Sequence, residues 1–264
     1  MSHYSFVFAT LLCSTVALSS ASAQERDPDA FRYDATLSRG RTVRLHNVNG
    51  SIDVERSGSN RVEVRAEKRW RRGDPDDVRI VQRTAENGDL VVCALWNDAE
   101  CTDTGIRSRR NSRWNDRNDV SVAFTLRVPD GVHVELNTVN GGVSADGIAG
   151  DVDASTVNGS ITARSTRGPV HAKTVNGSIR ATMGALGDEA LRYETVNGSI
   201  TLELPDNADA ELDLSTVNGG VSTDFPVTVQ GSISRRRLRG TVGDGGRLLK
   251  ASTVNGGITL RRAG

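Results

Sequence analysis

Apolar and polar residues alternate along most of the chain, and one short motif interrupts the alternation again and again. The motif reads Thr-Val-Asn-Gly, then Ser or Gly, then Ile or Val. Its first residue is Thr138, Thr156, Thr174, Thr195, Thr216 or Thr253, and a related copy begins at Asn47. Alternation with a period of two and one apolar face is typical of β-strands. The sequence therefore predicts a repeating unit of strand, VNG bend, strand and second bend.

The positions around the motif form columns of similar residues. Four residues before the motif Thr stand Val134, Val152, Val170, Leu191, Leu212 and Leu249. Two residues before it stand Leu136, Ala154, Ala172, Tyr193, Leu214 and Ala251, and five residues after it stand Val143, Ile161, Ile179, Ile200, Val221 and Ile258. Between the first two columns lie the polar residues Glu135, Asp153, His171, Arg192, Asp213 and Lys250. We expect the apolar columns to face a core and the polar column to face solvent.

Asn-Gly between alternating segments is also a strong hairpin signal, so a meander of hairpins is the alternative to stacked coils. Hairpin turns do not contact one another and need not be alike. Bends repeated every 18 to 21 residues favour a parallel β-solenoid, in which each coil lies about 4.8 Å above the last. The motif amides could then form a ladder from Asn49, Asn140, Asn158, Asn176, Asn197 and Asn218 to a terminal Asn255. We expect the glycines that follow to supply a positive φ: Gly141, Gly159, Gly177, Gly198, Gly219 and Gly256.

The pattern divides the chain into a less regular N-terminal β-strand region, residues 24–135, and a repeat region, residues 136–264. Strand-like segments occur at 60–67, 78–83, 89–96 and 120–129. Residues 97–119 are almost wholly polar and rich in Arg, which predicts a solvated loop.

The N-terminus resembles a signal peptide, residues 1–23. A 13-residue apolar run from Phe6 to Leu18 is too short to cross a bilayer and precedes the small residues Ala21-Ser22-Ala23. We expect an exported mature chain, periplasmic or on the cell surface, without a transmembrane segment. Cys93 and Cys101 would remain, and their spacing in an exported chain predicts a disulfide that closes a short loop.

Residues 128–163, VPDGVHVELNTVNGGVSADGIAGDVDASTVNGSITA, resemble the bacterial DUF4097 family of β-strand-repeat proteins, also called putative adhesins. The resemblance extends over roughly residues 31–262. It implies a β-solenoid-like fold and an envelope or surface setting, and it supplies no catalytic residues.

The search for chemistry finds no nucleophile, zinc or phosphate-binding motif, and we expect no cofactor, metal or catalytic site. The 33 basic and 33 acidic residues leave no net charge that would select nucleic acid. His46, His133 and His171 occupy outward strand positions, which predicts solvated side chains. The outward columns show no carboxylate pair on neighbouring coils, of the kind that glycosidases use.

Two surfaces remain as candidates for binding. Arg235, Arg236, Arg237 and Arg239 could bind an anionic glycan or lipopolysaccharide, or could lie in a solvated loop that interrupts the solenoid. The motif valines either turn into the corner of the core or form an exposed ridge for self-association or docking: Val139, Val157, Val175, Val196, Val217 and Val254.

The sequence therefore favours an exported, non-enzymatic β-solenoid that acts as a binding or adhesion module with a glycan, lipopolysaccharide or protein partner. The alternatives are a glycan-active enzyme on the same scaffold and a purely structural envelope protein.

Overall fold

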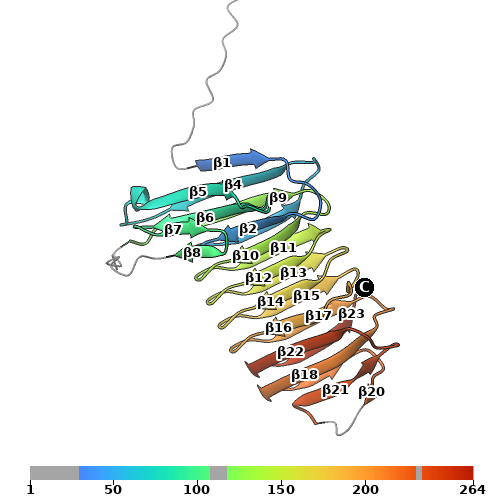
Figure 1. Ribbon diagram of the computed structural model, residues 1–264. Coiled ribbons are helices and arrows are strands. Elements are labelled where there is room, and N and C mark those ends of the chain that lie inside the picture. The colour runs from blue at the N-terminus through green and yellow to red at the C-terminus, as the bar shows by residue number, and fades with distance from the viewer. Residues whose placement is uncertain (1–29, 108–117, 230–233, 264) are drawn as a thin grey trace, which may run out of the picture.

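The computed structural model describes residues 30–107, 118–229 and 234–263, and most of its strands form two long sheets (Figure 1). Sheet A runs in the order β1 (Ala30–Ala35), β4 (Val62–Arg69), β9 (Ser121–Val128), β3 (Ile52–Arg56), β11 (Val143–Ile148), β13 (Ile161–Ser165), β15 (Ile179–Met183), β17 (Ile200–Leu204), β23 (Ile258–Arg262) and β19 (Val221–Thr223). Sheet B runs in the order β20 (Thr228–Val229), β21 (Arg237–Val242), β18 (Ala210–Asn218), β22 (Leu248–Asn255), β16 (Leu191–Glu194), β14 (Val170–Lys173), β12 (Val152–Ser155), β10 (His133–Asn137), β2 (Thr42–His46), β6 (Leu90–Trp96) and β5 (Val78–Thr84).

Each coil contributes one strand to each sheet, and the VNG bend joins the two strands. β10 of sheet B, for example, leads through the bend at Asn140 into β11 of sheet A. Neighbouring coils pair in parallel and in register, so that Val134 lies beside Val152 and Val152 beside Val170. These residues are at most 1% exposed. The parallel stacking and the apolar columns predicted from the sequence are therefore confirmed, and the hairpin meander is wrong for this region.

The order of the coils in space differs from their order in the sequence. β22 and β23, the last strands of the chain, pair with β16 and β17. The earlier strands β18 and β19 pair with the opposite edges of β22 and β23, so they lie at the outside of the stack. The expectation that Asn255 ends the ladder is wrong, because the chain returns after β21 and inserts its last coil between two earlier ones.

Antiparallel strands close both ends of the stack. At the N-terminal end β1 pairs with β4, β4 with β9, and β5 with β6, and the 3-10 helix η1 (Pro75–Asp77) leads into β5. At the C-terminal end β21 pairs with β18, and β20 with β21. These strands cover the ends of the core, as the partly buried Phe31 and Tyr33 do on β1. The strand pair β2 and β3 lies within the same two sheets as the repeat region.

The core between the sheets is thin and is filled mainly by Val, Ile, Leu and Ala. Its largest fully buried side chain is Tyr193, which occupies a column that holds Ala154 and Ala172 in the preceding coils. The Tyr193 hydroxyl donates to the Met183 sulfur at 3.1 Å, and burial raises the pKa of Tyr193. The hydrogen bond removes the penalty of an unpaired hydroxyl in an apolar core.

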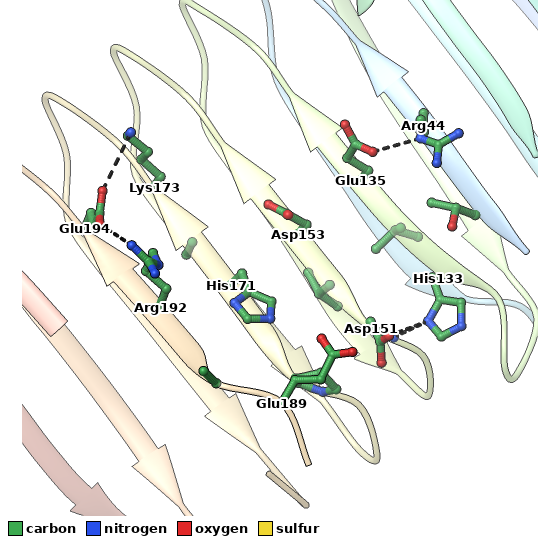
Figure 2. A pocket seen from close by; sticks show the side chains of 16 residues that line it. Arg44, His133, Glu135, Asp151, Asp153, His171, Lys173, Glu189, Arg192 and Glu194 are labelled. Atoms are coloured by element: carbon green, nitrogen blue, oxygen red, sulfur yellow. Dashed lines mark hydrogen bonds and ion pairs between the residues drawn. The ribbon is translucent and has the colours of Figure 1, made fainter. Parts of the chain in front are cut away.

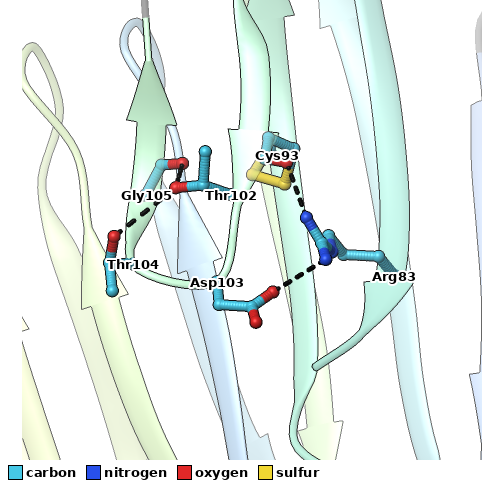
Figure 3. Close-up of a disulfide and its surroundings, with 7 residues drawn as sticks. Arg83, Cys93, Thr102, Asp103, Thr104 and Gly105 are labelled. Atoms are coloured by element: carbon cyan, nitrogen blue, oxygen red, sulfur yellow. Dashed lines mark hydrogen bonds and ion pairs between the residues drawn. A yellow bond between two sulfur atoms is a disulfide. The ribbon is translucent and has the colours of Figure 1, made fainter. Parts of the chain in front are cut away.

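A second, smaller core lies on the outer face of sheet B. β6 is buried on both faces, because the hairpin of β7 (Glu100–Thr102) and β8 (Gly105–Arg107) packs over it. A disulfide between Cys93 on β6 and Cys101 on β7 holds the hairpin there (Figure 3). The predicted disulfide is present. The prediction of a wholly solvated loop is wrong for residues 100–107, whose apolar Ile106 contributes to this second core.

Several predictions concern residues outside those that the structure describes. The signal peptide with its cleavage site and most of the Arg-rich segment (108–117) fall in this group.

Candidate functional site

The VNG bends stack into a continuous ladder of side-chain amides. Asn140 donates from Nδ2 to Oδ1 of Asn49 at 2.8 Å, and the same bond repeats from coil to coil at 2.7–2.9 Å. In spatial order the ladder runs through Asn49, Asn140, Asn158, Asn176, Asn197, Asn255 and Asn218. Its two ends are therefore Asn49 and Asn218.

Each motif Thr serves the stack in a second way. The buried hydroxyl of Thr174 donates to the carbonyl oxygen of Gly159, in the preceding coil, at 2.9 Å. The equivalent bond of Thr195 to Gly177 measures 2.8 Å. The hydroxyls thus pair carbonyls that the bend would otherwise bury without a partner.

The reason for glycine in the motif differs from the expected one. Gly177 does not have a positive φ, unlike Gly50, whose φ is 122°. A Cβ atom on Gly177 would lie 2.0 Å from the carbonyl oxygen of Gly159. Close approach of stacked backbones, and not the bend conformation, excludes a side chain at most motif glycines.

The motif valines face solvent. Val139, Val157, Val196 and Val254 are 38–39% exposed and Val217 is 54% exposed, whereas Val175 is partly exposed. The two alternatives left open by the sequence are thus decided in favour of an exposed row.

A broad groove of about 580 Å³ lies on the outer face of sheet B, across β10, β12, β14 and β16 (Figure 2). Its floor is the polar column identified from the sequence, because Glu135, Asp153 and His171 are direct neighbours on adjacent strands. The second bends form one side of the groove and contribute Asp151 and Glu189. Because the strands pair in parallel and in register, residues 18 positions apart in the sequence lie side by side and form one continuous surface.

Ion pairs and a hydrogen bond hold the side chains at the rim of the groove. Arg44 contacts Glu135 at 2.9 Å and Asp89 at 2.8 Å, and the Asp151 backbone N–H donates to Nδ1 of His133 at 2.9 Å. At the other end Glu194 lies 3.6 Å from both Lys173 and Arg192. The exposed pairs of Glu194 add little stability, whereas the pair of Arg44 with the buried Asp89 is shielded from solvent. Both sets of contacts orient side chains that a ligand would meet.

The floor of the groove is less fully paired than its rim. Within the described residues, Asp153 and His171 on the floor and Glu189 on the side of the second bends form no side-chain hydrogen bond or ion pair. The surrounding protein raises the pKa of Asp153 by desolvation, although the side chain keeps an exposed surface. The positive influence of His171 opposes this rise and the carboxylate of Glu135 adds to it. The free polar groups are therefore concentrated where a ligand would sit.

The three histidines do not share one environment. His133 and His171 line the groove at outward positions, as predicted. His46 is only 6% exposed, because the β7–β8 hairpin covers it, and a Cβ atom on Gly105 would lie 3.7 Å from the imidazole. The prediction of a solvated His46 is thus wrong. Burial lowers the pKa of His46, against the opposing effect of Glu135, and Nε2 has no hydrogen-bond partner in the described part of the chain.

The disulfide-bonded β7–β8 hairpin borders the N-terminal end of the groove. Two smaller hollows lie between the hairpin and Glu135. One is lined by Asp103 and Thr104, and the other by Thr102 and Arg107. Arg83 stabilises the hairpin from β5 by contacting Asp103 at 3.0 Å and donating to the carbonyl oxygen of Cys101 at 3.0 Å (Figure 3). Glu135 is thus the residue at which the three hollows meet.

The solvated-loop alternative holds for only part of the Arg run, because Arg235 and Arg236 lie in an exposed turn. Its second half begins β21, the strand that closes the C-terminal end of sheet B. Arg239 contacts Asp213 at 3.1 Å and Arg237 contacts it at 3.6 Å, and both cations lower the pKa of Asp213. The run forms a basic surface two strands beyond the groove, with β18 and β22 between them, and one carboxylate partly neutralises it.

Sequence reasoning missed two features of this face. Glu135 and Asp153 are a carboxylate pair on neighbouring coils, which the column itself contained and which the expectation of no such pair overlooked. The β7–β8 hairpin was not predicted, because residues 100–107 contain too few apolar residues to indicate strands. Cys101 and Ile106, each between non-apolar neighbours, were the available signal.

Among the described residues, no cluster of His, Cys, Asp and Glu has the arrangement of a metal site. The same residues contain no helix of the length and apolarity needed to cross a membrane.

Comparison with known proteins identifies the family. The model of the family described as Toastrack DUF4097 matches residues 84–261, about two thirds of the chain. The chain belongs to the DUF4097 family. No curated protein matches this sequence.

Solved structures with a similar arrangement have low sequence identity to this DUF4097 chain. One is named a putative cell adhesion protein from Clostridium sporogenes; it is 8% identical with a TM-score of 0.46, over 89% of this chain and 100% of its own. Another is a putative adhesin from Bacteroides fragilis, 12% identical with a TM-score of 0.32, over 89% of this chain and 98% of its own. A third, a putative adhesin from Parabacteroides merdae, is 10% identical with a TM-score of 0.26, over 90% and 98% of the two chains.

Proposed function

We propose that this DUF4097 protein is an exported, non-enzymatic binding module of the bacterial envelope or cell surface, and that the outer face of sheet B is its ligand-binding face. The observation that carries the proposal is the groove over β10 to β16, whose rim is held by ion pairs and whose Asp153, His171 and Glu189 side chains have no hydrogen-bond or ion-pair partner within the described residues. Such groups can bond a ligand without first breaking a bond inside the protein.

The scaffold suits binding because it is rigid and repetitive. Every strand beneath the groove is paired on both sides, and its inward side chains are buried. A ligand that lies along the stack therefore meets one row of polar groups for each rise of about 4.8 Å. An extended polymer such as a glycan fits this arrangement better than a compact small molecule, which would contact only one or two rows.

Export rests on the sequence features of residues 1–23 and on the disulfide, which is typical of oxidising compartments. Arg237 and Arg239 on β21 extend the same sheet toward the C-terminal end of the stack. Together with Arg235 and Arg236 in the preceding turn, they could contact acidic groups of an envelope glycan or lipopolysaccharide.

The test is a binding array of envelope glycans and lipopolysaccharides, probed with residues 24–264 and with two variants. Asp153→Asn combined with Arg192→Gln changes the groove, whereas Arg164→Gln changes an exposed arginine on the outer face of sheet A and serves as the matched control. We expect saturable binding that only the groove variant weakens, by about tenfold if two charged contacts are lost. Equal binding by all three proteins would refute the assignment of the face.

A glycan-active enzyme is the second candidate, and one observation favours it. Glu135 and Asp153 are adjacent carboxylates, and the pKa of Asp153 is raised, as a general acid in glycoside cleavage requires. The same array, followed by product analysis, separates the two functions. Turnover that is abolished by Glu135→Gln and by Asp153→Asn would establish the enzyme and overturn the binding module.

A further inference from the structure

The bends of the solenoid form a second surface, on a different side from the groove. We call it the VNG edge, and it comprises residues 47–51, 138–142, 156–160, 174–178, 195–199, 253–257 and 216–220 in spatial order. None of these residues is charged, in a chain of which 25% of the residues are charged. Five of its seven valines are exposed, Val175 is partly exposed, and Val48 packs against the core; its asparagines are joined in one ladder. The VNG edge is thus neutral, rigid and partly apolar.

The exposed valines are not explained by the packing of the core. Their neighbours Thr and Ile in the motif are buried, whereas Val157 and Val196 keep 38% and 39% of their surface exposed. A β-branched residue favours extended backbone, but Thr would meet that need without exposing a second methyl group. Proteins usually interrupt a long exposed apolar strip with charged residues, which prevent association. This edge has none.

We infer that the VNG edge is a self-association surface, where a second copy of this chain binds edge to edge about a two-fold axis. The edge is its own best complement, because the rows of both copies repeat at the same rise, so that each valine of one copy can lie opposite a valine of the other. Two neutral edges also approach without desolvating charges, which every other face described above would require.

The positive charge at one end of the VNG edge favours an antiparallel orientation of the two copies. The segment with Arg235 and Arg236 lies against the last bend, since Val221 donates its backbone N–H to the Arg235 carbonyl at 3.0 Å and Thr216 donates to that of Arg236 at 2.8 Å. Copies aligned in the same direction would bring the two basic ends together. A two-fold axis perpendicular to the edge places the copies antiparallel and keeps these ends apart.

The size of the edge predicts a weak dimer. Six steps of about 4.8 Å give a length of about 29 Å, and the spacing of about 10 Å between sheets gives its width, so each copy would bury roughly 300 Å². A stable interface buries about 800 Å² on each partner. We therefore expect a dissociation constant above about 1 μM, so that association occurs where copies are concentrated.

The antiparallel arrangement makes a specific prediction about contacts. In spatial order the valines are Val48, Val139, Val157, Val175, Val196, Val254 and Val217, so Val175 is the central one. With the two edges fully overlapped, Val175 meets its own copy and Val157 meets Val196 of the second copy.

The experiment measures sedimentation over a wide concentration range, together with oxidative cross-linking in a Cys13→Ser background. We expect reversible dimers, and at least a tenfold weaker dimer for the variant with Val157, Val175 and Val196 all changed to Thr. In the cross-linking experiment Val175→Cys should cross-link to itself, whereas Val157→Cys should cross-link only when mixed with Val196→Cys.

A chain that stays monomeric at the highest concentration would overturn the inference, as would a dimer that the triple Thr variant leaves unchanged. If the triple variant lost stability, the single cysteine variants would still decide, because cross-linking of Val217→Cys to itself in preference to Val175→Cys contradicts the antiparallel edge.

Discussion

Asn255 donates a 2.7 Å hydrogen bond to the side-chain oxygen of Asn197, 58 residues earlier in the chain, while Asn218, the next motif after Asn197 in the sequence, bonds to the outer side of Asn255. The chain therefore completes the outermost coil before it inserts the last one. In the folded chain β22 and β23 lie between strands that precede them in the sequence.

This order changes the expected effect of mutations in the ladder. Asn255 and Asn176 each have a ladder neighbour on both sides, whereas Asn218 has one. We expect Asn255→Ala and Asn176→Ala to destabilise the protein by about 1 kcal/mol or slightly more, and Asn218→Ala by about half as much. Denaturant unfolding of the three variants provides the measurement. If Asn218→Ala cost as much as Asn255→Ala, the ladder would not be the source of the stabilisation.

Gly141 and Gly142 provide a matched pair of substitutions at adjacent positions. A Cβ atom on Gly141 would lie 2.1 Å from the Gly50 carbonyl oxygen, whereas one on Gly142 would lie 3.4 Å from the nearest atom, in a position that other coils fill with Ser. We expect Gly141→Ala to cost about 3 kcal/mol or more, since two backbones must separate, and Gly142→Ala to cost well under 1 kcal/mol. Thermal and denaturant unfolding compare them directly, and similar losses would show that stacking is looser than described.

Loss of the disulfide should destabilise the β7–β8 hairpin more than the stacked coils. Purified protein should show no titratable thiol from Cys93 and Cys101 until it is reduced. Changing both residues to Ser removes a short cross-link worth about 2–3 kcal/mol in the entropic account. Hydrogen exchange should then speed up in residues 99–107 and over the outer face of β6, with little change in β12 to β17. Uniformly faster exchange would mean that the hairpin is integral to the whole fold.

His46 should make stability depend on pH. Burial lowers the pKa of His46 in the folded protein, so between the ordinary value of about 6.5 and that lower value the unfolded chain binds more protons than the folded one. The stability contributed by neutral His46 is therefore complete above about pH 6.5 and is lost as the pH falls below it. His46→Asn introduces the residue that Asn137 supplies at the same position of the next coil.

The measurement is denaturant unfolding of the wild type and of His46→Asn from pH 8 to pH 5. We expect a shallower decline for the variant below about pH 6.5. Parallel curves would show that other groups cause the pH dependence and that His46 is protonated without opening the hairpin.

The sequence by itself determined the repeating unit, its inward columns and the stacking of its bends. Local signals suffice for this, because the alternation of apolar and polar residues fixes which side chains can be buried together. Identical bends, such as those at Asn158 and Asn176, indicate stacking because only bends that contact one another need to be alike. The pairing of Cys93 with Cys101 followed in the same way from their short separation. The residue pattern of a single coil was thus enough to predict most of the solenoid.

Tertiary structure alone decided what depends on relations between distant segments. The insertion of Asn255 beside Asn197 could not be predicted, because the copies at Asn218 and Asn255 are nearly identical and either can pair with the preceding coil. His46 follows the outward pattern of a strand, yet a hairpin placed more than fifty residues later covers it. The groove also needed the register between coils, since Glu135, Asp153 and His171 become neighbours only through parallel pairing. Local periodicity fixes the face on which a side chain lies, but its neighbours on that face are fixed by long-range packing.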